Sequence, residues 1–548
     1  MARVNKLKDI KKYFQKRKDA GKDDVLSAVS IALFLIFLPL ANSISYLQND
    51  EYTRYRIFQN FINGKFDLDP YIGTTFYLQG FVGTLWAKIF GMDKMAILTL
   101  LVSVLSFYFF TKILKKHLNK STVESLLIGS LLLLNPIFVY LSFGFMSDNY
   151  FLPFLILSTY FILEFDSSKK PKDFLIVNLF IILGYFVRQL SLVTSIAFFV
   201  YLLLTKRYKY AFYQLLFFAG LWLFHYNVFP ITPQMYDENI RLKVLLKKER
   251  TLSLAYVLLI YLVAFTMPLV ITFIRKKKKI LPILLAIPLF LFLNKNFKPE
   301  KITYRTRTAE GEVYTSYGKG EFPYIDNVFG RKGYLQEAII GDKYHYPGNF
   351  DLFRFWDLCS KILGPILIIS ILLNLKESIN FFSIFTWGYM CLLLISPMLW
   401  DRYFLPPVTM GILMLAAGIK KLEKLDKFLL GGFLVLNLFI SYLYLSDFYL
   451  ANTYIWGEAE RIVEETGKER HEINVNHSWR KLYLCERKGT NPRCYDYVFK
   501  YDPIEKQPRD VDYFEIINEH KIEFPFSIYI DPKIYTYKRI IPVELDTR

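Results

Sequence analysis

The sequence predicts an all-α polytopic membrane protein with about thirteen transmembrane helices, outer interfacial helices and a small C-terminal α/β or α+β domain. Of the 548 residues, 53% are hydrophobic and 18% aromatic, yet Lys and Arg outnumber Asp and Glu by 68 to 49. The basic residues form short clusters between long apolar runs. The net charge of +19 therefore indicates anchoring at a membrane surface, with no nucleic acid as a partner.

The spans follow from the apolar runs, because about 20 apolar residues are needed to cross roughly 30 Å of hydrocarbon. The basic segment 1–25 resembles the flank of a signal peptide, but no small-residue cleavage site follows, so the first apolar run is expected to stay as a span. The transmembrane region is predicted over residues 26–447. Its candidate spans lie near 26–47, 94–114, 123–143, 150–165, 174–187, 189–205, 211–229, 252–274, 280–293, 358–374, 379–399, 404–419 and 427–447.

The positive charges predict the sidedness of the chain, since Lys and Arg accumulate in cytoplasmic loops. Every second connection is basic, and the segment 243–250 is the main exception. The other basic segments, all predicted to be cytoplasmic, are the N-terminus, 112–120, 169–172, 206–209, 275–279, Lys376 and 420–427. An odd number of spans then places the C-terminus outside the cytoplasm.

The long hydrophilic connections fall on the outer side, which predicts that the protein acts there. They are residues 48–93, 230–251, 294–357 and 448–548. Within the first, 54–63 and 75–90 are amphipathic and are expected to lie in the outer interface as helices. The tail from 448 is densely charged and has strand-like stretches such as 526–530, which predicts a small extracytoplasmic domain. Cys485 and Cys494 flank a short Gly- and Pro-containing loop there, and a disulfide is expected if the compartment is oxidising.

Four polar clusters stand at predicted outer boundaries of the membrane. Asp50 and Glu51 follow the first span, and such a pair suits a general base, although a helix end re-entering water is the simpler explanation. Asp148 begins a later span. Ionisable groups at that depth are usually paired or functional.

The other two clusters contain arginine. Arg188 and Gln189 lie between two apolar runs, where ordinary snorkelling of the arginine is the alternative. Arg402 and Tyr403 follow Asp401 in the run WDRYFLPP, where an aromatic-belt turn is the alternative. A guanidinium group can donate two parallel hydrogen bonds to one phosphate. Because all four clusters fall on one predicted face, a single outer cavity is expected to hold them.

Together these clusters resemble the GT-C superfamily of membrane glycosyltransferases. The resemblance lies in the acidic pair, the following GKFDLDPYIGTTFYLQG, Ser147-Asp148, Arg188-Gln189 and DRYFLPP. The loop phrase is similar to dolichyl-phosphate-glucose glucosyltransferases. Protein O-mannosyltransferases belong to the same superfamily, and the span count with an outer tail is similar to aminoarabinose transferases. The lysine of the Glu-Lys-Pro-Pro phrase in that last branch has no counterpart here, and Lys65 or Lys88 is expected to replace it.

The resemblance implies a polyprenyl-phosphate sugar donor and inverting transfer to a lipid, glycan or protein acceptor at the extracytoplasmic face of the cell membrane. It assigns Asp50, or Glu51, as the base and Asp148 as a second carboxylate that orients the acceptor or a divalent ion. Arg188 and Arg402 are assigned to the donor phosphate, Tyr403 to a hydrogen bond from its hydroxyl to the substrate, and Gln189 to substrate binding. No metal-ligand spacing is evident, so a divalent cation is left open. The rival functions are a transporter or lipid flippase, for which no repeated halves are visible, and a polysaccharide polymerase or ligase.

Overall fold

The computed structural model describes most of the membrane region and part of the C-terminal segment. The described residues are 25–48, 50–69, 72–73, 75–228, 245, 248–277, 281–296, five short strands between 305 and 334, 352–374, 379–396, 399–483, 495–502, 513–523 and 533–540. Only residue 25 of the predicted segment 1–25 lies within these ranges. The predicted strand at 526–530 lies outside them. Cys485 and Cys494 also lie outside them, so the disulfide stays a prediction.

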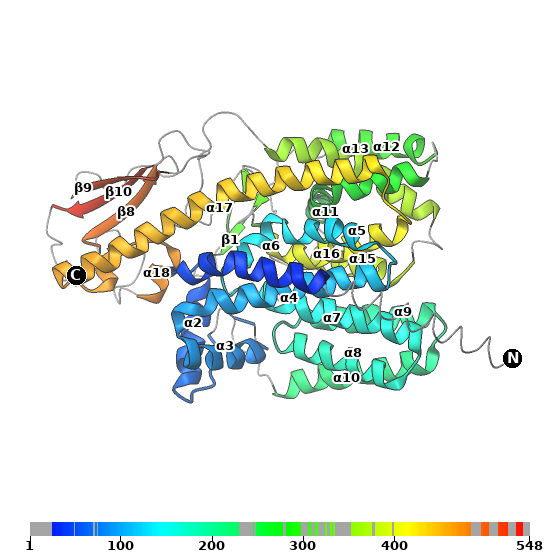
Figure 1. Cartoon of the computed structure of the whole chain (residues 1–548), viewed down its shortest axis with the longest axis horizontal. Coiled ribbons are helices and arrows are strands. Elements are labelled where there is room, and N and C mark those ends of the chain that lie inside the picture. Colours follow the sequence, from blue (N-terminus) through cyan, green and yellow to red (C-terminus); the bar gives the residue numbers. More distant parts are fainter. Residues whose placement is uncertain are drawn as a thin grey trace.

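Each predicted span coincides with helix. After a first helix, Val25–Ser43, come α4 (Met95–Lys116), α5 (Thr122–Leu133), α6 (Pro136–Leu141), α7 (Ser147–Ser168), α8 (Pro171–Tyr185), α9 (Ser191–Leu204), α10 (Tyr208–Val228), α11 (Lys248–Lys277), α12 (Leu281–Asn296), α13 (Leu352–Leu373), α15 (Phe381–Leu394), α16 (Leu405–Gly418) and α17 (Lys424–Thr466). Many of them run in nearly the same direction, for example α4, α7, α8 and α17 (Figure 1).

Length and composition separate these helices into two groups. Six are long and apolar enough to cross a membrane in the described part of the chain: Val25–Ser43, Met92–Lys116, Ser147–Ser168, Leu254–Lys276, Phe355–Leu373 and Lys424–Tyr442. Four more apolar helices are shorter: Thr122–Leu133, Ser191–Leu204, Leu281–Asn296 and Phe381–Leu394. The count of about thirteen crossings stays a prediction.

The predicted span over 123–143 is formed by two helices. Asn135 separates α5 from α6, and its side-chain oxygen accepts a hydrogen bond from the backbone N–H of Ile137 at 2.9 Å. Pro136 is the first residue of α6, where its missing N–H costs no hydrogen bond. A capping Asn followed by Pro starts a new helix even within an apolar run.

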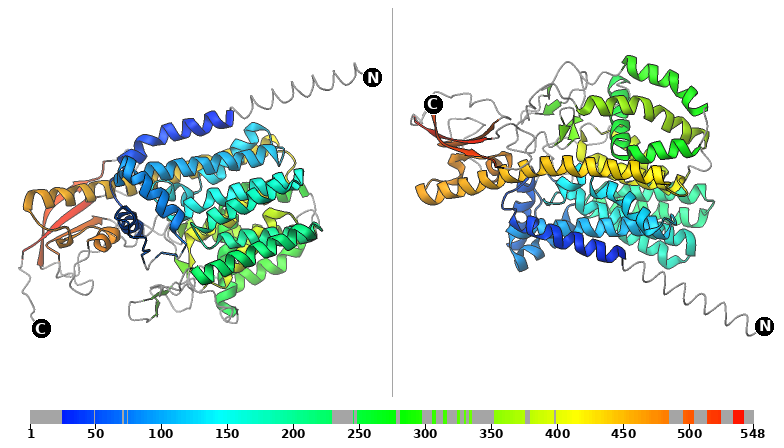
Figure 2. Two further views of the ribbon diagram at one scale, coloured as in Figure 1. Left: turned by 90° about the horizontal axis from the view of Figure 1, so that it is seen from below. Right: turned by 45° about the horizontal axis from the view of Figure 1, so that its top comes forward.

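The helix that contains the last predicted span, 427–447, is longer than the span. Helix α17 continues over 43 residues to Thr466, where Gly467 ends it in a left-handed conformation with φ of +68°. Its C-terminal half therefore reaches from the helical bundle to the C-terminal strands, as two further views show (Figure 2).

A small mixed sheet follows α17. Its strand order is β7 (Ile473–Asn474), β8 (Tyr497–Asp502), β10 (Lys533–Arg539) and β9 (Phe514–Lys521). The pair β7–β8 is parallel, and the pairs β8–β10 and β10–β9 are antiparallel. With the short helix α18 (His477–Leu482), this arrangement confirms the predicted mixture of helix and strand, while the domain boundary at 448 stays a prediction.

The two helices expected in the first long connection are present as α2 (Glu51–Ile62) and α3 (Tyr77–Phe90), while their place in the outer interface stays a prediction. They lie at the end of the bundle that also carries α18 and the sheet (Figure 1). Part of the connection 294–357 lies beside residues 399–400, because β3 (Tyr324–Ile325) pairs in parallel with β6 (Leu399–Trp400). Strand β6 leads directly into the one-turn helix η4 (Asp401–Phe404).

Ion pairs join the loops that were predicted to be cytoplasmic. Arg207 pairs with Asp166, and Arg275 pairs with Asp426 at 2.5 Å. The backbone N–H of Leu422 donates to Glu124 at 2.8 Å. The basic loops therefore meet one another, as a common sidedness requires. We call this region the basic end.

Candidate active site

Four side chains from four separate segments form a continuous chain of ion pairs. Asp50 precedes α2, Asp148 is in the first turn of α7, Arg188 lies in the turn between α8 and α9, and Arg402 lies in η4. Arg402 Nη2 lies 3.3 Å from Asp50 Oδ2, and Arg402 Nε lies 3.5 Å from Asp148 Oδ2. The other oxygen of Asp148 pairs with Arg188 Nη1. We call these four residues the acid–arginine cluster.

Aromatic rings fix the planes of both guanidinium groups. Arg188 lies over the ring of Tyr403, 4.6 Å from its centroid, and Arg402 lies over the ring of Trp400 at 4.7 Å. Such stacking orients a guanidinium and leaves its edge donors available. Tyr403 thus supports Arg188 with its ring, whereas the hydrogen bond expected from its hydroxyl to a substrate stays a prediction.

The members of the cluster differ in accessibility. The side chain of Asp148 is 3% exposed and those of Arg402 and Arg188 are 10% and 15% exposed, whereas Asp50 reaches 28%. Burial acts to lower the pKa of Arg402, but the carboxylates of Asp148 and Asp50 raise it above its ordinary value. The arginine therefore stays protonated, and Asp50 is the acidic group that a substrate can reach.

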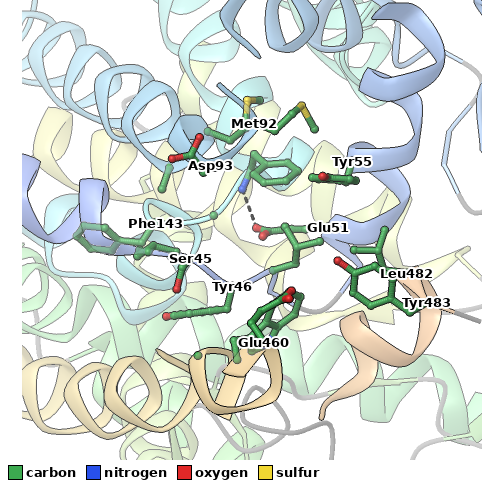
Figure 3. Close-up of a pocket in the computed structure, with 18 residues that line it drawn as sticks. Ser45, Tyr46, Glu51, Tyr55, Met92, Asp93, Phe143, Glu460, Leu482 and Tyr483 are labelled. Carbon is green, nitrogen blue, oxygen red and sulfur yellow. Dashed lines mark hydrogen bonds between the residues drawn. The ribbon is translucent and has the colours of Figure 1, made fainter. Parts of the chain in front are cut away.

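Glu51 is arranged quite differently from its neighbour. One carboxylate oxygen accepts a hydrogen bond from Gln48 N at 2.8 Å and the other from Phe145 N at 2.7 Å. The residue is buried, and burial raises the pKa of Glu51 to about 8, against the effect of these two N–H donors. Glu51 therefore ties α2 to the loop before α7, two residues ahead of Ser147-Asp148 (Figure 3).

Comparison with known proteins finds one family. Residues 76–230 match the family model described as dolichyl-phosphate-mannose-protein mannosyltransferase. This match covers α3 to α10 and includes Asp148 and Arg188. The chain is a membrane glycosyltransferase that is similar to this GT-C type family over those residues. No curated protein and no solved structure matches the chain.

This glycosyltransferase is a multi-pass membrane protein that uses a polyprenyl-phosphate sugar donor. In the residues that the structure describes, no group of three or more His, Cys, Asp or Glu side chains is placed to hold a metal ion. The remaining predicted substrate residues, Gln189, Lys65 and Lys88, are exposed. Gln189 is adjacent to the cluster in sequence, whereas Lys65 follows the end of α2 and Lys88 lies near the end of α3. The geometry does not bring these two lysines into the acid–arginine cluster.

Three further residues of the glycosyltransferase support the cluster and escaped the sequence prediction. Arg54 Nη1 donates to the backbone oxygen of Asp50 at 2.7 Å, a contact that the four-residue spacing on one helix indicates in retrospect. Trp400 lies beneath Arg402. Gly144 faces Glu51 so closely that a Cβ atom there would lie 1.9 Å from Oε1 of the carboxylate, a contact that no sequence pattern reveals.

Proposed function

We propose that the protein transfers a sugar from polyprenyl phosphate to an acceptor hydroxyl with inversion at the anomeric carbon, on the extracytoplasmic face of the membrane. The observation that carries this proposal is the acid–arginine cluster, which places an accessible carboxylate beside two fixed guanidinium groups. The basic end supports the sidedness, because basic loops are typical of the cytoplasmic face and the cluster lies at other ends of the same helices.

In the proposed reaction Asp50 takes the proton from the acceptor hydroxyl. The acceptor oxygen forms a bond to the anomeric carbon while the bond from that carbon to the phosphate oxygen breaks. Asp50 is preferred to Glu51 as the base because its side chain is partly exposed, whereas both oxygens of Glu51 already accept backbone hydrogen bonds. A general base must reach the proton that it removes.

The leaving polyprenyl phosphate gains negative charge as the sugar departs, and Arg188 and Arg402 are proposed to stabilise it. Fixed donors aimed at developing charge lower the barrier because they need no reorganisation during the reaction. Asp148 contacts both guanidinium groups. We therefore assign it to positioning the arginines, in place of the expected role in holding an acceptor or an ion.

The decisive test replaces Asp50 by Asn, which keeps the size of the side chain and removes the base. Transfer by the purified protein is expected to fall by about 10²- to 10⁴-fold. The donor panel includes polyprenyl-phosphate mannose, the sugar that the family description names, beside glucose and aminoarabinose forms. Loss of each donor is followed by mass spectrometry.

The matched control is Asp166→Asn, which removes a carboxylate of the basic end that also pairs with an arginine. It is expected to keep near-normal turnover. Turnover retained by Asp50→Asn would remove Asp50 from the role of base. Equal losses in both variants would show that only general stability had been affected.

A further inference from the structure

A pocket of about 420 Å³ lies beside the acidic pair. The segment leading into α2 and the start of α4 form one wall, the loop before α7 forms another, and α17 and α18 close it (Figure 3). Its lining includes Glu51 but not Asp50. A volume in this range is typical of sites that bind small ligands.

The chemistry of the lining excludes a phosphate and favours a carbohydrate. No Lys, Arg or His is among the lining residues, so nothing there would neutralise a phosphate. Six lining residues are aromatic: Tyr46, Tyr55, Phe143, Phe145, Trp456 and Tyr483. Their faces suit the C–H faces of sugar rings, and carboxylate and phenol oxygens accept hydrogen bonds from sugar hydroxyls.

The polar groups of the pocket are held in place by partners outside it. Arg470 donates to Glu460 through Nε at 3.0 Å and through Nη2 at 2.7 Å, and it also lies 5.5 Å from the ring centroid of Tyr483. Trp456 packs edge-on against Trp479, with ring centroids 4.9 Å apart. A rigid lining of this kind binds without a large cost of ordering side chains.

One residue keeps the pocket open. Gly457 lines it between Trp456 and Glu460, and a Cβ atom at this position would meet nothing within 4 Å. A Cβ atom at 457 therefore enters open space and does not disturb packed atoms. The sequence supplies a control on the same helix, because Gly432 also has nothing within 4 Å and does not line the pocket.

We propose that this pocket binds the acceptor of the transfer reaction and that the acceptor is an uncharged carbohydrate. The proposal rests on the proposed function, since it places the acceptor next to the acidic pair and the donor phosphate at the arginines. It assigns a binding role to α17 and α18, which lie outside the matched residues 76–230.

The test measures binding, so that its result is independent of turnover. Neutral gluco-, manno-, galacto- and chito-oligosaccharides of two to six units are titrated against the purified protein, with saturation-transfer NMR as the readout. At least one is expected to bind the wild-type protein, Gly432→Phe and Asp50→Asn. Gly457→Phe is expected to weaken that binding by at least about tenfold, since its ring would occupy the sugar site.

Several results would overturn the proposal. Equal binding to Gly457→Phe would place the sugar elsewhere, and no binding of any oligosaccharide to the wild-type protein would contradict a carbohydrate site. Binding of Ser- and Thr-containing peptides alone would indicate a protein acceptor. Loss of polyprenyl-phosphate binding in Gly457→Phe would indicate a lipid pocket. If Asp50→Asn retains turnover while Gly457→Phe loses sugar binding, the proposed base fails and the pocket stands.

Discussion

The two ends of the helical bundle both contain ion pairs between distant segments, but the pairs are built differently. At the basic end a paired carboxylate also stabilises the start of a helix. Asp426, in the first turn of α17, pairs with Arg275 and accepts a hydrogen bond from Glu423 N at 2.8 Å. In the acid–arginine cluster, Asp148 is shared by two arginines, and Arg402 is shared by two carboxylates.

This difference separates a structural role from a chemical one. A carboxylate that caps a helix and pairs with an exposed cation stabilises the fold and has no reason to meet a ligand. Shared arginines backed by aromatic rings keep edge donors aligned before any substrate arrives. Such preorganisation is what stabilising a leaving phosphate requires. The comparison thus predicts that conservative changes will be tolerated at the basic end and not in the cluster.

The largest effect in this comparison is expected from Arg402→Lys. A lysine keeps the positive charge but cannot span Asp50 and Asp148 with a planar fork, so we expect donor turnover to fall by about 10²- to 10³-fold. Arg275→Lys makes the same change at the basic end and should leave turnover near the wild-type value. Comparable losses in the two variants would contradict the distinction between the two ends.

The sequence predicted the acid–arginine cluster better than it predicted the helices that carry it. The apolar runs located helices, and the basic loops brought four clusters to one predicted face. The break at Asn135-Pro136 was missed because both flanking runs are apolar, and the extension of α17 was missed because its C-terminal half is polar. The separate roles of Asp50 and Glu51 could not be predicted either, because adjacent residues point in different directions only once the chain has folded.

Gly144→Ala sharpens the comparison by testing how the cluster is held. The new methyl group would collide with the Glu51 carboxylate, which must move and release Phe145 N. Since that loop leads into Asp148, we expect a loss of turnover between about tenfold and 10²-fold, typical of a small misplacement of catalytic groups. Gly432→Ala adds the same methyl group outside the pocket, where nothing lies within 4 Å, and should have little effect on turnover.

The outcome that would count against this positioning role is a Gly144→Ala protein with normal turnover. The thermal midpoint of each variant is measured alongside the rate. A lowered midpoint with an unchanged rate would assign the contact between Gly144 and Glu51 to stability alone.

The smallest effect concerns how stability depends on pH. We expect the contributions of a carboxylate near the cluster and of one at the basic end to change with pH in opposite directions. Burial raises the pKa of Glu51 to about 8, so the folded protein favours its protonated form more than the unfolded chain does. Its contribution to stability is therefore fully present below the ordinary pKa near 4.5 and is lost as the pH rises toward 8. At the basic end, hydrogen bonds from Lys276 and Arg275 lower the pKa of Glu423, so its contribution is present above its ordinary pKa and is lost only in acid.

We expect the thermal midpoint of the detergent-solubilised protein to fall by several degrees more between pH 5 and pH 8 in the wild type than in Glu51→Gln. Glu423→Gln should leave that part of the profile unchanged, because its group titrates below this range. Parallel profiles for wild type and Glu51→Gln would show that Glu51 is already ionised in the folded protein at pH 5. The two backbone N–H donors would then outweigh burial at this carboxylate.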